Sequence, residues 1–414
     1  MLMPVEQKQI MLNGDEAVAY AVKQCDVDVV SAFPITPQTI IVERLSEYKF
    51  NGEVDFEFIP VESEHSAMSA LVGASAAGAR CFTATSSQGL LLMNEILWIA
   101  ASLRLPIVMA IASRAVSGPI NIHCDHTDVM STRDTGWVIL ITENVQEAYD
   151  TTIQAFKIAE HPDVLLPVLF VLDGFVVSHT AENLWVIKND EDVHRFLGGP
   201  RKVPKIKVMG KEVEFSLNPK NPVPLTFGPF DMFDWYFEHK VSQFAAYENV
   251  PRVVKQVNEE YGQLTGRKYG NGVIETYQME DAEIAAVIMG SGAGTAKDVI
   301  DEMREEGIKI GLVRIRLYRP FPAEDVLRAL RNTKVVGVFD RAQHGGAIGG
   351  PLFLDIRSTL YDLDKKPIVV NYIYGLGGRD LTASLVRTAF DELVEIAKGV
   401  KKPFVMKYLG VRGE

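Results

Sequence analysis

The sequence predicts an α/β protein built from two doubly wound, parallel-sheet domains. The chain has 414 residues, which is more than one hydrophobic core usually organises. Short continuous apolar runs alternate with segments whose apolar residues recur every three to four positions, as buried parallel strands and the helices between them do. This alternation occurs twice, and a stretch rich in proline and aromatic residues separates the two series. We therefore expect domains at 1–250 and 251–414.

The first series consists of strand-like and helix-like segments in regular alternation. The strand-like segments are 27–33, 54–61, 79–86, 105–113, 137–143 and 165–174. The helix-like segments are 15–24, 39–48, 64–78, 89–103 and 145–160. This order is typical of a doubly wound α/β sheet.

The alternation weakens from about residue 186 to residue 275, apart from a helical pattern at 250–264. We interpret this stretch as a connector that packs on the first domain, with its aromatic residues available to a partner chain. The second series has strand-like segments at 283–290, 310–318, 334–340 and 367–375. Its helix-like segments are 295–307, 323–332, 351–363 and 381–399. Residues 401–414 lack periodicity, which predicts a tail or an arm onto a neighbouring chain.

Charge and composition exclude several classes of protein. A net charge of -12 disfavours nucleic acid and anionic membrane surfaces as partners, because both require a basic footprint. The longest apolar stretch is interrupted by Asn94, Glu95, Arg104 and Pro106, so it does not predict a membrane span. The N-terminus lacks the charged and apolar regions of a signal peptide. We therefore expect a cytoplasmic protein.

The cysteines predict neither a disulfide framework nor a metal centre. Cys25, Cys81 and Cys124 are widely separated and form no CxxC pair, which is the spacing that zinc and iron-sulfur sites commonly use. We expect any redox metal to lie on another chain.

Polar residues follow the predicted strands of the first series. Ligands of open α/β sheets bind beyond the carboxyl ends of the strands, so these residues are candidates for a site. In chain order they are Thr36 in FPITPQT, Glu64 in VESEH, Ser87 and Gln88 in SSQG, Arg114, and Asp125, His126 and Asp128 in the loop GPINIHCDHTDV. We expect them to converge on one rim.

Each candidate also has a structural interpretation. Thr36 fits a proline-stiffened turn in which threonine caps the next helix. Glu64 fits an acid favoured by the dipole of a helix start, and Arg114 could pair with a surface acid. The histidines and carboxylates at 123–128 could hold a metal ion, but their spacing matches no standard zinc pattern. A rim that gathers all of them favours a functional site.

These segments resemble a known family. FPITPQT, VESEHSAMSALVGASAAGARCFTATSSQGLLLM, SRAVSGPINIHCDHTDVMSTRDTGW and GLGGRDLT are similar to the alpha subunit of the 2-oxoacid:ferredoxin oxidoreductases, most closely the pyruvate type. The resemblance covers nearly the whole chain. It implies a thiamine diphosphate pyrimidine-type domain followed by a transketolase C-terminal-like domain.

The resemblance also implies roles for the candidate residues. Glu64 would hydrogen-bond the aminopyrimidine ring of the cofactor, and a desolvated carboxyl can hold the proton that this needs. Arg114 would clamp the substrate carboxylate, and Thr36 would bind near the oxo and carboxylate oxygens. Ser87 and Gln88 would lie beside the cofactor, and the loop with Asp125, His126 and Asp128 would cover the site. The resemblance implies no role for His123 and Cys124, so the substrate preference stays open.

What the chain lacks predicts its partners. It has no GDG motif, the usual start of the site that holds the diphosphate through Mg²⁺. The resemblance therefore implies a beta subunit that holds the diphosphate and carries an iron-sulfur cluster, together with gamma- and delta-type subunits. It also implies coenzyme A as co-substrate and ferredoxin as electron acceptor. Ferredoxins are acidic, so we expect ferredoxin to dock on another subunit.

Two other functions compete with this prediction. The chain could be the pyrimidine-side subunit of an NAD-linked 2-oxo acid dehydrogenase or a transketolase-like enzyme. It could also be a non-enzymatic dinucleotide-binding protein that uses the glycines at 290–294. That segment, GSGAG, does not match the GxGxxG fingerprint, so we expect a tight turn into a helix instead. We expect the glycine-rich segments at 340–350 and 375–380 to serve subunit packing or to contact coenzyme A.

Overall fold

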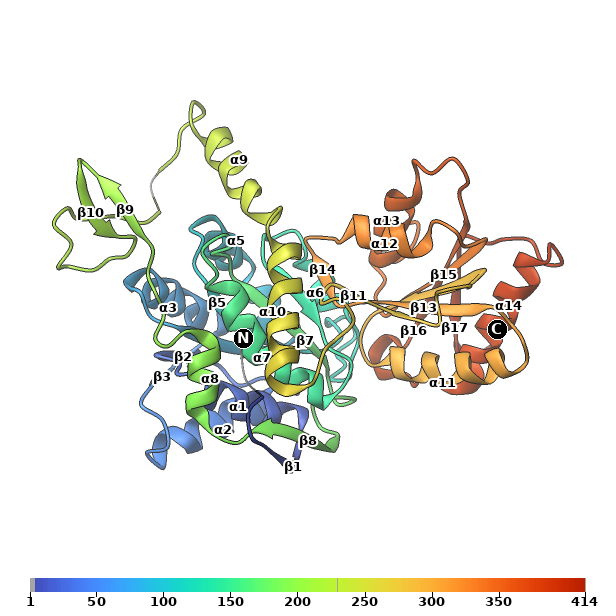
Figure 1. Ribbon diagram of the computed structural model, residues 1–414, viewed down its shortest axis with the longest axis horizontal. Helices are drawn as coiled ribbons and strands as arrows, with labels where there is room; N and C mark the ends of the chain where they lie inside the picture. Colours follow the sequence, from blue (N-terminus) through green and yellow to red (C-terminus); the bar gives the residue numbers. More distant parts are fainter. Residues whose placement is uncertain (1–3, 229, 414) are drawn as a thin grey trace.

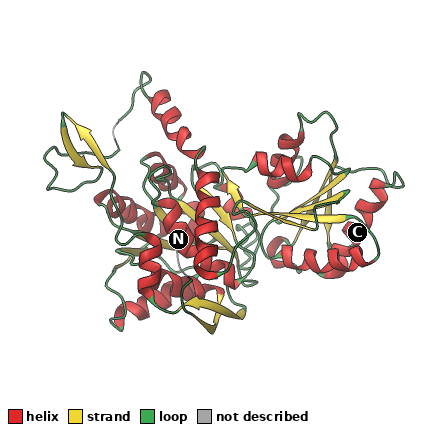
Figure 2. Cartoon of the chain, in the orientation of Figure 1, coloured by secondary structure: helices red, strands yellow, loops and turns green. Residues whose placement is uncertain are grey.

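Residues 4–228 and 230–413, which the computed structural model describes, form two large sheets with helices on both faces (Figure 1, Figure 2). The fold class predicted from the sequence is confirmed, although both sheets also carry an antiparallel strand at one edge. Among the helices of these residues, none combines the length and apolar character that crossing a membrane requires.

The first sheet has the strand order β14-β6-β7-β5-β4-β2-β3. Its strands are β2 (Val29–Ala32), β3 (Glu57–Pro60), β4 (Cys81–Thr85), β5 (Ile107–Ser113), β6 (Val138–Ile141), β7 (Val168–Asp173) and β14 (Leu317–Arg319). The helices of this part of the chain are α1 (Gly14–Gln24), α2 (Thr39–Phe50), α3 (Glu64–Ala77), α4 (Ser87–Leu92), α5 (Asn94–Ser102), α6 (Thr127–Ser131) and α7 (Val145–Ala159).

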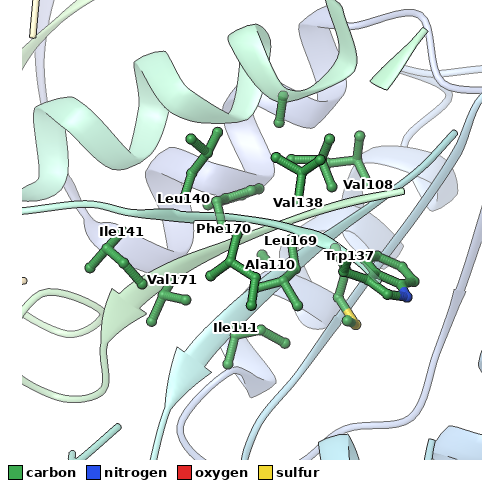
Figure 3. Packing of buried hydrophobic residues seen from close by; sticks show 14 of the residues in the cluster. Val108, Ala110, Ile111, Trp137, Val138, Leu140, Ile141, Leu169, Phe170 and Val171 are labelled. Carbon is green, nitrogen blue, oxygen red and sulfur yellow. The ribbon is translucent and has the colours of Figure 1, made fainter. Parts of the chain in front are cut away.

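Strands β5, β6 and β7 form the centre of the core. Every residue of these strands is buried, which explains why their sequences are continuous apolar runs. Figure 3 shows side chains of the three strands packed together, among them Ile111, Leu140 and Phe170. Full burial of one such side chain stabilises the fold by about 1.5–3 kcal/mol. The apolar runs that predict the strands are therefore also what holds the first domain together.

The winding of the first sheet reverses between β2 and β4. From β2 the chain crosses to β3 on one side, and from β4 it crosses to β5 on the other. Because β2 and β4 are neighbours, the loops after them flank the crevice where ligands of open α/β sheets bind. Thr36 lies in the first loop, and Ser87 begins α4 one residue after the loop leaves β4.

The second sheet has the strand order β11-β13-β12-β15-β16-β17. Its strands are β11 (Ile274–Tyr277), β12 (Ile284–Ile288), β13 (Ile310–Ile315), β15 (Val335–Asp340), β16 (Ile368–Tyr374) and β17 (Met406–Leu409). Its helices are α11 (Gly292–Glu305), α12 (Ala323–Leu330), α13 (Pro351–Leu360) and α14 (Ala383–Ala397), with the short 3-10 turn η1 (Leu376–Gly378) after β16. This sheet reverses between β12 and β15, and the loops after these two strands face the first domain.

The connector contains more structure than its sequence predicts. β8 (Ala181–Ile187) pairs antiparallel with β1 (Gln7–Asn13), a strand that the sequence pattern does not reveal. α8 (Asp190–Leu197), the hairpin β9 (Lys205–Val208) and β10 (Lys211–Glu214), and α9 (Tyr236–Tyr247) follow. α10 (Val250–Thr265) confirms the predicted helix and packs on α7. Figure 1 shows α9 and the hairpin projecting from the body of the first domain. The boundary at 250/251 stays a prediction.

Two predicted elements are divided in the structure. The helix predicted at 89–103 is α4 and α5, which meet at Met93; no glycine or proline marks that break. The strand predicted at 310–318 is β13 followed by β14, which joins the first sheet. At this division Arg314 and Arg316 bond to the buried Glu147 of α7, at 2.7 Å and 2.8 Å. Local periodicity in the sequence gives no information about a partner so far away in the chain.

The prediction of a C-terminal tail is wrong for residues 406–409. They form β17, which pairs parallel with β16 at the edge of the second sheet. Four residues are too few to show a period, so only the pairing itself reveals the strand.

Candidate active site

Arg114 follows β5 and lies at the mouth of the crevice. Only 6% of the residue is exposed, yet its guanidinium bonds to two backbone carbonyls rather than to an acid. Nη1 donates to the carbonyl of Thr36 at 2.9 Å, and Nε donates to the carbonyl of Asn121 at 3.0 Å. A guanidinium has five N–H donors, so three remain for a ligand. Burial lowers the pKa of Arg114, with Asp128 opposing, but a guanidinium stays charged at neutral pH. The predicted surface ion pair is therefore wrong, and the geometry favours a buried cation that an anionic ligand can reach.

Thr36 is brought beside Arg114, as the sequence predicts. Its carbonyl accepts the arginine bond, and the residue itself is exposed. The helix that follows begins at Thr39, and its N-cap position is Gln38, without a side-chain cap. Thr36 is therefore not the helix cap, which leaves its hydroxyl at the rim for another use.

Glu64 is the first residue of α3, and Ser63 caps that helix. The carboxyl is 5% exposed, and burial raises its pKa while its own backbone N–H opposes the shift. Helix α4 approaches it closely: a Cβ added to Gly89 would lie 2.4 Å from Glu64 Oε1 and 2.5 Å from Thr85 Oγ1. Glycine is thus needed at position 89, because any side chain there would displace the carboxyl of Glu64.

Ser87 and Gln88 occupy the first turn of α4 and connect the surroundings of Glu64 with those of Arg114. The Ser87 hydroxyl lies 2.6 Å from the carbonyl of Ala115, next to Arg114. It is also 2.7 Å from Gln88 Oε1. Within the part of the chain that the structure describes, the buried Gln88 Nε2 and Thr85 Oγ1 have no hydrogen-bond partner. Two buried polar atoms without partners are costly unless a ligand binds them.

Asp128 hydrogen-bonds to both Ser87 and Arg114 and so connects the two strand ends. One carboxyl oxygen accepts from the backbone N–H of Ser87 at 2.9 Å and of Arg114 at 3.0 Å. The other accepts from the hydroxyl of Ser113 and the backbone N–H of Val129, both at 2.8 Å. Burial raises the pKa of Asp128 to about 6, against the hydrogen bonds that lower it. Its four bonds fix the ends of β4 and β5, so Asp128 positions the site and has no oxygen left for a substrate.

Asp125 and His126 face the second domain. Asp125 accepts from the backbone N–H of Gly377 at 3.2 Å, and the backbone N–H of His126 donates to the carbonyl of Arg341 at 2.8 Å. The ring of His126 bonds within the first domain, where Nε2 lies 2.7 Å from Asp173 Oδ1. Asp173 also accepts from Arg341 Nη1 at 2.8 Å. Burial would raise the pKa of Asp173, but His126 and Arg341 hold it well below its usual range. The geometry therefore gives Asp125 and His126 interdomain contacts, and their predicted role over the substrate stays a prediction.

The candidate metal ligands near this loop differ from those that the sequence suggests. Cys124, His126 and Asp173 place ligand atoms within 4.8 Å of one another. However, the Ser291 hydroxyl donates to Asp173 at 2.6 Å, and the charge of Arg341 borders the group. Burial raises the pKa of Cys124 well above its ordinary value, and a metal ligand must be a thiolate. The three residues fit a hydrogen-bonded contact better than a cation site.

Sequence reasoning missed four residues of this region: Asn121, Asp173, Ser291 and Arg341. Asp173 ends β7, so the rule that selects polar residues at strand ends could have found it. Ser291 belongs to the GSGAG turn, which confirms the predicted tight turn into a helix because α11 begins at Gly292. The glycine-rich segment at 375–380 packs on the first domain of the same chain, and its predicted subunit contacts are untested.

Comparison with known proteins identifies the family. Residues 20–259 match the family model "Pyruvate flavodoxin/ferredoxin oxidoreductase, thiamine diP-bdg", and residues 282–386 match "Pyruvate:ferredoxin oxidoreductase core domain II".

Curated relatives match over nearly their whole length. The chain is 47% identical to the pyruvate synthase subunit PorA of Thermotoga maritima over 410 residues, 98% of each chain. It is 46% identical to the PorA subunit of Methanocaldococcus jannaschii, covering 92% of this chain and 94% of that one. It is 41% identical to the ketoisovalerate oxidoreductase subunit VorA of Pyrococcus abyssi, covering 96% and 97%.

Solved structures share the fold. A 2-oxoglutarate:ferredoxin oxidoreductase from Magnetococcus marinus matches 93% of this chain and 65% of its own, with a TM-score of 0.72 at 19% identity. A split-gene transketolase matches 93% of this chain and 99% of its own, with a TM-score of 0.51 at 14% identity. The family predicted from the sequence is thus confirmed: the chain belongs to the pyruvate flavodoxin/ferredoxin oxidoreductase family.

Proposed function

We propose that this chain is the alpha-type subunit of a thiamine diphosphate-dependent pyruvate:ferredoxin oxidoreductase. The reaction is the oxidative decarboxylation of pyruvate to acetyl-CoA and CO₂, with reduction of ferredoxin. The observation that carries the proposal is that a buried carboxyl, Glu64, and a buried arginine, Arg114, both lie on the carboxyl edge of the first sheet, where its winding reverses.

The residues around Glu64 fit the aminopyrimidine half of the cofactor. Burial raises the pKa of Glu64, which favours the protonated carboxyl that can donate to a ring nitrogen. Thr85 Oγ1 and Gln88 Nε2 are the buried polar atoms without partners that a polar ring would satisfy. When bound, thiamine diphosphate supplies the carbon nucleophile and the electron sink for decarboxylation. What this chain contributes is the orientation of the ring and the proton at Glu64.

Arg114 binds the carboxylate of the 2-oxo acid. Its two carbonyl contacts fix the plane of the guanidinium, and its remaining N–H groups suit a planar carboxylate. The Thr36 hydroxyl, next to Arg114 at the exposed rim, donates to a substrate oxygen. Asp128 holds the turn at Ser87 and the backbone of Arg114 in register, so both halves of the site keep a fixed geometry.

The proposed site is incomplete without other chains. The sequence lacks the GDG motif, so a beta subunit holds the diphosphate with Mg²⁺ and carries an iron-sulfur cluster. The names of the PorA relatives as subunits support an assembly of this kind. Gamma- and delta-type subunits complete the electron path to ferredoxin, and coenzyme A takes the acyl group.

A second substrate has a specific observation in its favour. The VorA relative, named for ketoisovalerate, is 41% identical to this chain, only a little less than the PorA relatives. A branched 2-oxo acid is therefore the alternative to pyruvate. We expect oxalate to be disfavoured, because Thr36 offers no second cation for a second carboxylate.

The test is viologen reduction by the natively purified complex with coenzyme A. The panel is pyruvate, 2-oxoisovalerate, 2-oxoglutarate and oxalate, each also assayed with NAD⁺ in place of the viologen. We expect the highest kcat/KM on pyruvate. A maximum on 2-oxoisovalerate would transfer the proposal to the branched substrate. Reduction of NAD⁺ alone, or of neither acceptor by an intact complex, would overturn it.

A further inference from the structure

The second domain contacts the loop that holds Arg114. We call residues 118–128 the rim loop. Residues 375–378, which are Gly375 after β16 and the 3-10 turn η1, are called the glycine turn. Asn121 Nδ2 of the rim loop donates to the carbonyl of Gly377 at 2.9 Å. In the other direction, the backbone N–H of Gly377 donates to Asp125 Oδ2 at 3.2 Å. The two segments are thus joined by reciprocal hydrogen bonds, although they lie more than 250 residues apart in the chain.

The glycine turn tolerates no side chain where it meets the rim loop. Gly377 and Gly378 have φ angles of +61° and +84°, which L-residues rarely adopt. A Cβ added to Gly377 would lie 2.4 Å from Asn121 Nδ2, and one added to Gly378 would lie 2.3 Å from the Cβ of His123. The backbone of Gly377 and Gly378 therefore lies so close to the side chains of Asn121 and His123 that only glycine fits.

The same asparagine orients Arg114. The carbonyl of Asn121 accepts from Arg114 Nε at 3.0 Å, while its Oδ1 accepts from the backbone N–H of His123 at 2.8 Å. Asn121 therefore carries three bonds that connect the glycine turn, the bend of the rim loop and the guanidinium. A shift of the glycine turn moves the carbonyl that fixes Arg114 Nε.

Arg341 braces this contact from behind. Its carbonyl accepts from the backbone N–H of His126 at 2.8 Å, and its Nε donates to the carbonyl of Gly375 at 3.3 Å. Its Nη1 bonds to Asp173 at 2.8 Å. Arg341 thus contacts the rim loop through its backbone carbonyl, and the glycine turn and the end of β7 through its buried side chain.

We propose that the glycine turn of the second domain is a positioning element for Arg114, acting through Asn121, and sets the affinity of the site for the substrate carboxylate. This inference rests on the proposed function, in which Arg114 binds that carboxylate. Positioning matters here because a guanidinium that is displaced by about 1 Å loses the paired geometry of its bonds to a carboxylate.

The first test is Gly377→Ala in the assembled complex, measured as KM and kcat for the preferred 2-oxo acid. We expect KM to rise about tenfold with kcat within about threefold of wild type, since the loss is one of substrate binding. Gly399→Ala is the matched control: Gly399 has a similar φ of +73°, but a Cβ there would meet nothing within 4 Å. It carries the backbone strain without the clash, so its KM should stay at the wild-type value.

The second test is Asn121→Ala, which removes the contact without straining the backbone and so remains informative if Gly377→Ala does not assemble. We expect a similar rise in KM, and no further rise in the double variant, because both changes break one connection. Arg114→Ala measured in parallel separates the two proposals. If Arg114→Ala impairs kcat/KM but Asn121→Ala and Gly377→Ala keep the KM of the control, the inference is overturned and the proposed function stands. If Arg114→Ala leaves kcat/KM unchanged, the role of Arg114 in the proposed function fails first.

Discussion

Two buried carboxyls at the carboxyl edge of the first sheet have opposite surroundings. Glu64, at the start of α3, has its pKa raised by burial. Asp173, at the end of β7, is fully buried, yet His126 and Arg341 hold its pKa well below the usual range. One environment favours a proton on the carboxyl, and the other favours permanent charge. The comparison supports the proposal that the chemistry takes place at Glu64, whereas Asp173 bonds to residues of both domains.

The strongest test of this difference is the loss of Glu64. We expect Glu64→Ala to lower kcat by about a thousandfold or more while the complex still assembles, because activation of the cofactor is worth several kcal/mol. The measurement is viologen reduction by the purified complex. Glu62→Ala, the same change at an exposed neighbour, is the control and should keep nearly full activity. Activity of the Glu64 variant within about tenfold of wild type would remove Glu64 from the mechanism.

Asp173 should show the opposite profile, with a large effect on stability. Asp173→Asn leaves Arg341 buried without its charged partner, and breaking such a pair typically costs about 3–5 kcal/mol. We expect a lower free energy of unfolding, measured by denaturant titration. Asp163→Asn removes one partner of an exposed pair with Arg252 and should change stability by less than about 1 kcal/mol. Equal stability of the two variants would show that the Asp173 cluster does not join the domains.

Arg114, like Glu64, takes part in the proposed reaction. Arg114→Ala should lower kcat/KM for the 2-oxo acid by about a hundredfold, since it removes a charge-assisted clamp and leaves the cofactor half of the site intact. Arg328→Ala, at an exposed position in α12, is the control. An unchanged kcat/KM would refute the clamp.

The smallest expected effect concerns pH. A carboxyl whose folded-state pKa is raised destabilises the fold increasingly as pH rises above its unfolded value of about 4.3, whereas a lowered pKa, as at Asp173, stabilises the fold above about 3.9. Glu64→Gln should therefore raise the melting temperature of the complex at neutral pH and leave it unchanged at pH 4. Asp173→Asn should lower the melting temperature more at neutral pH than at acidic pH. A Glu64→Gln variant that is less stable than wild type at neutral pH would contradict the environment assigned to Glu64.

Local sequence patterns predicted most of the fold, because the burial of strands and of helix faces determines where apolar residues recur in the sequence. The continuous apolar runs of β5 and β7 and the amphipathic helix α7 could be predicted without any partner. β17 and β14 could not be, because their identity depends on pairing with β16 and β6. Arg314 and Arg316 show the same limit, since their partner Glu147 lies in another domain of the chain.

The candidate site shows the same difference between local features, which the sequence predicts, and long-range contacts, which it does not. The sequence by itself determined the family and the strand ends that form the rim, and it predicted Thr36, Glu64, Ser87, Gln88 and Arg114 as site residues, because motifs and strand ends are local features. Only the tertiary structure decided that Asp128 has no oxygen free for a substrate, and that the Asp125 side chain and the backbone N–H of His126 bond to Gly377 and Arg341 of the second domain. It alone joined Asn121 to Gly377, which are 256 positions apart. The physical reason is that a hydrogen bond between distant segments depends on how two sheets pack, and no local period records that packing.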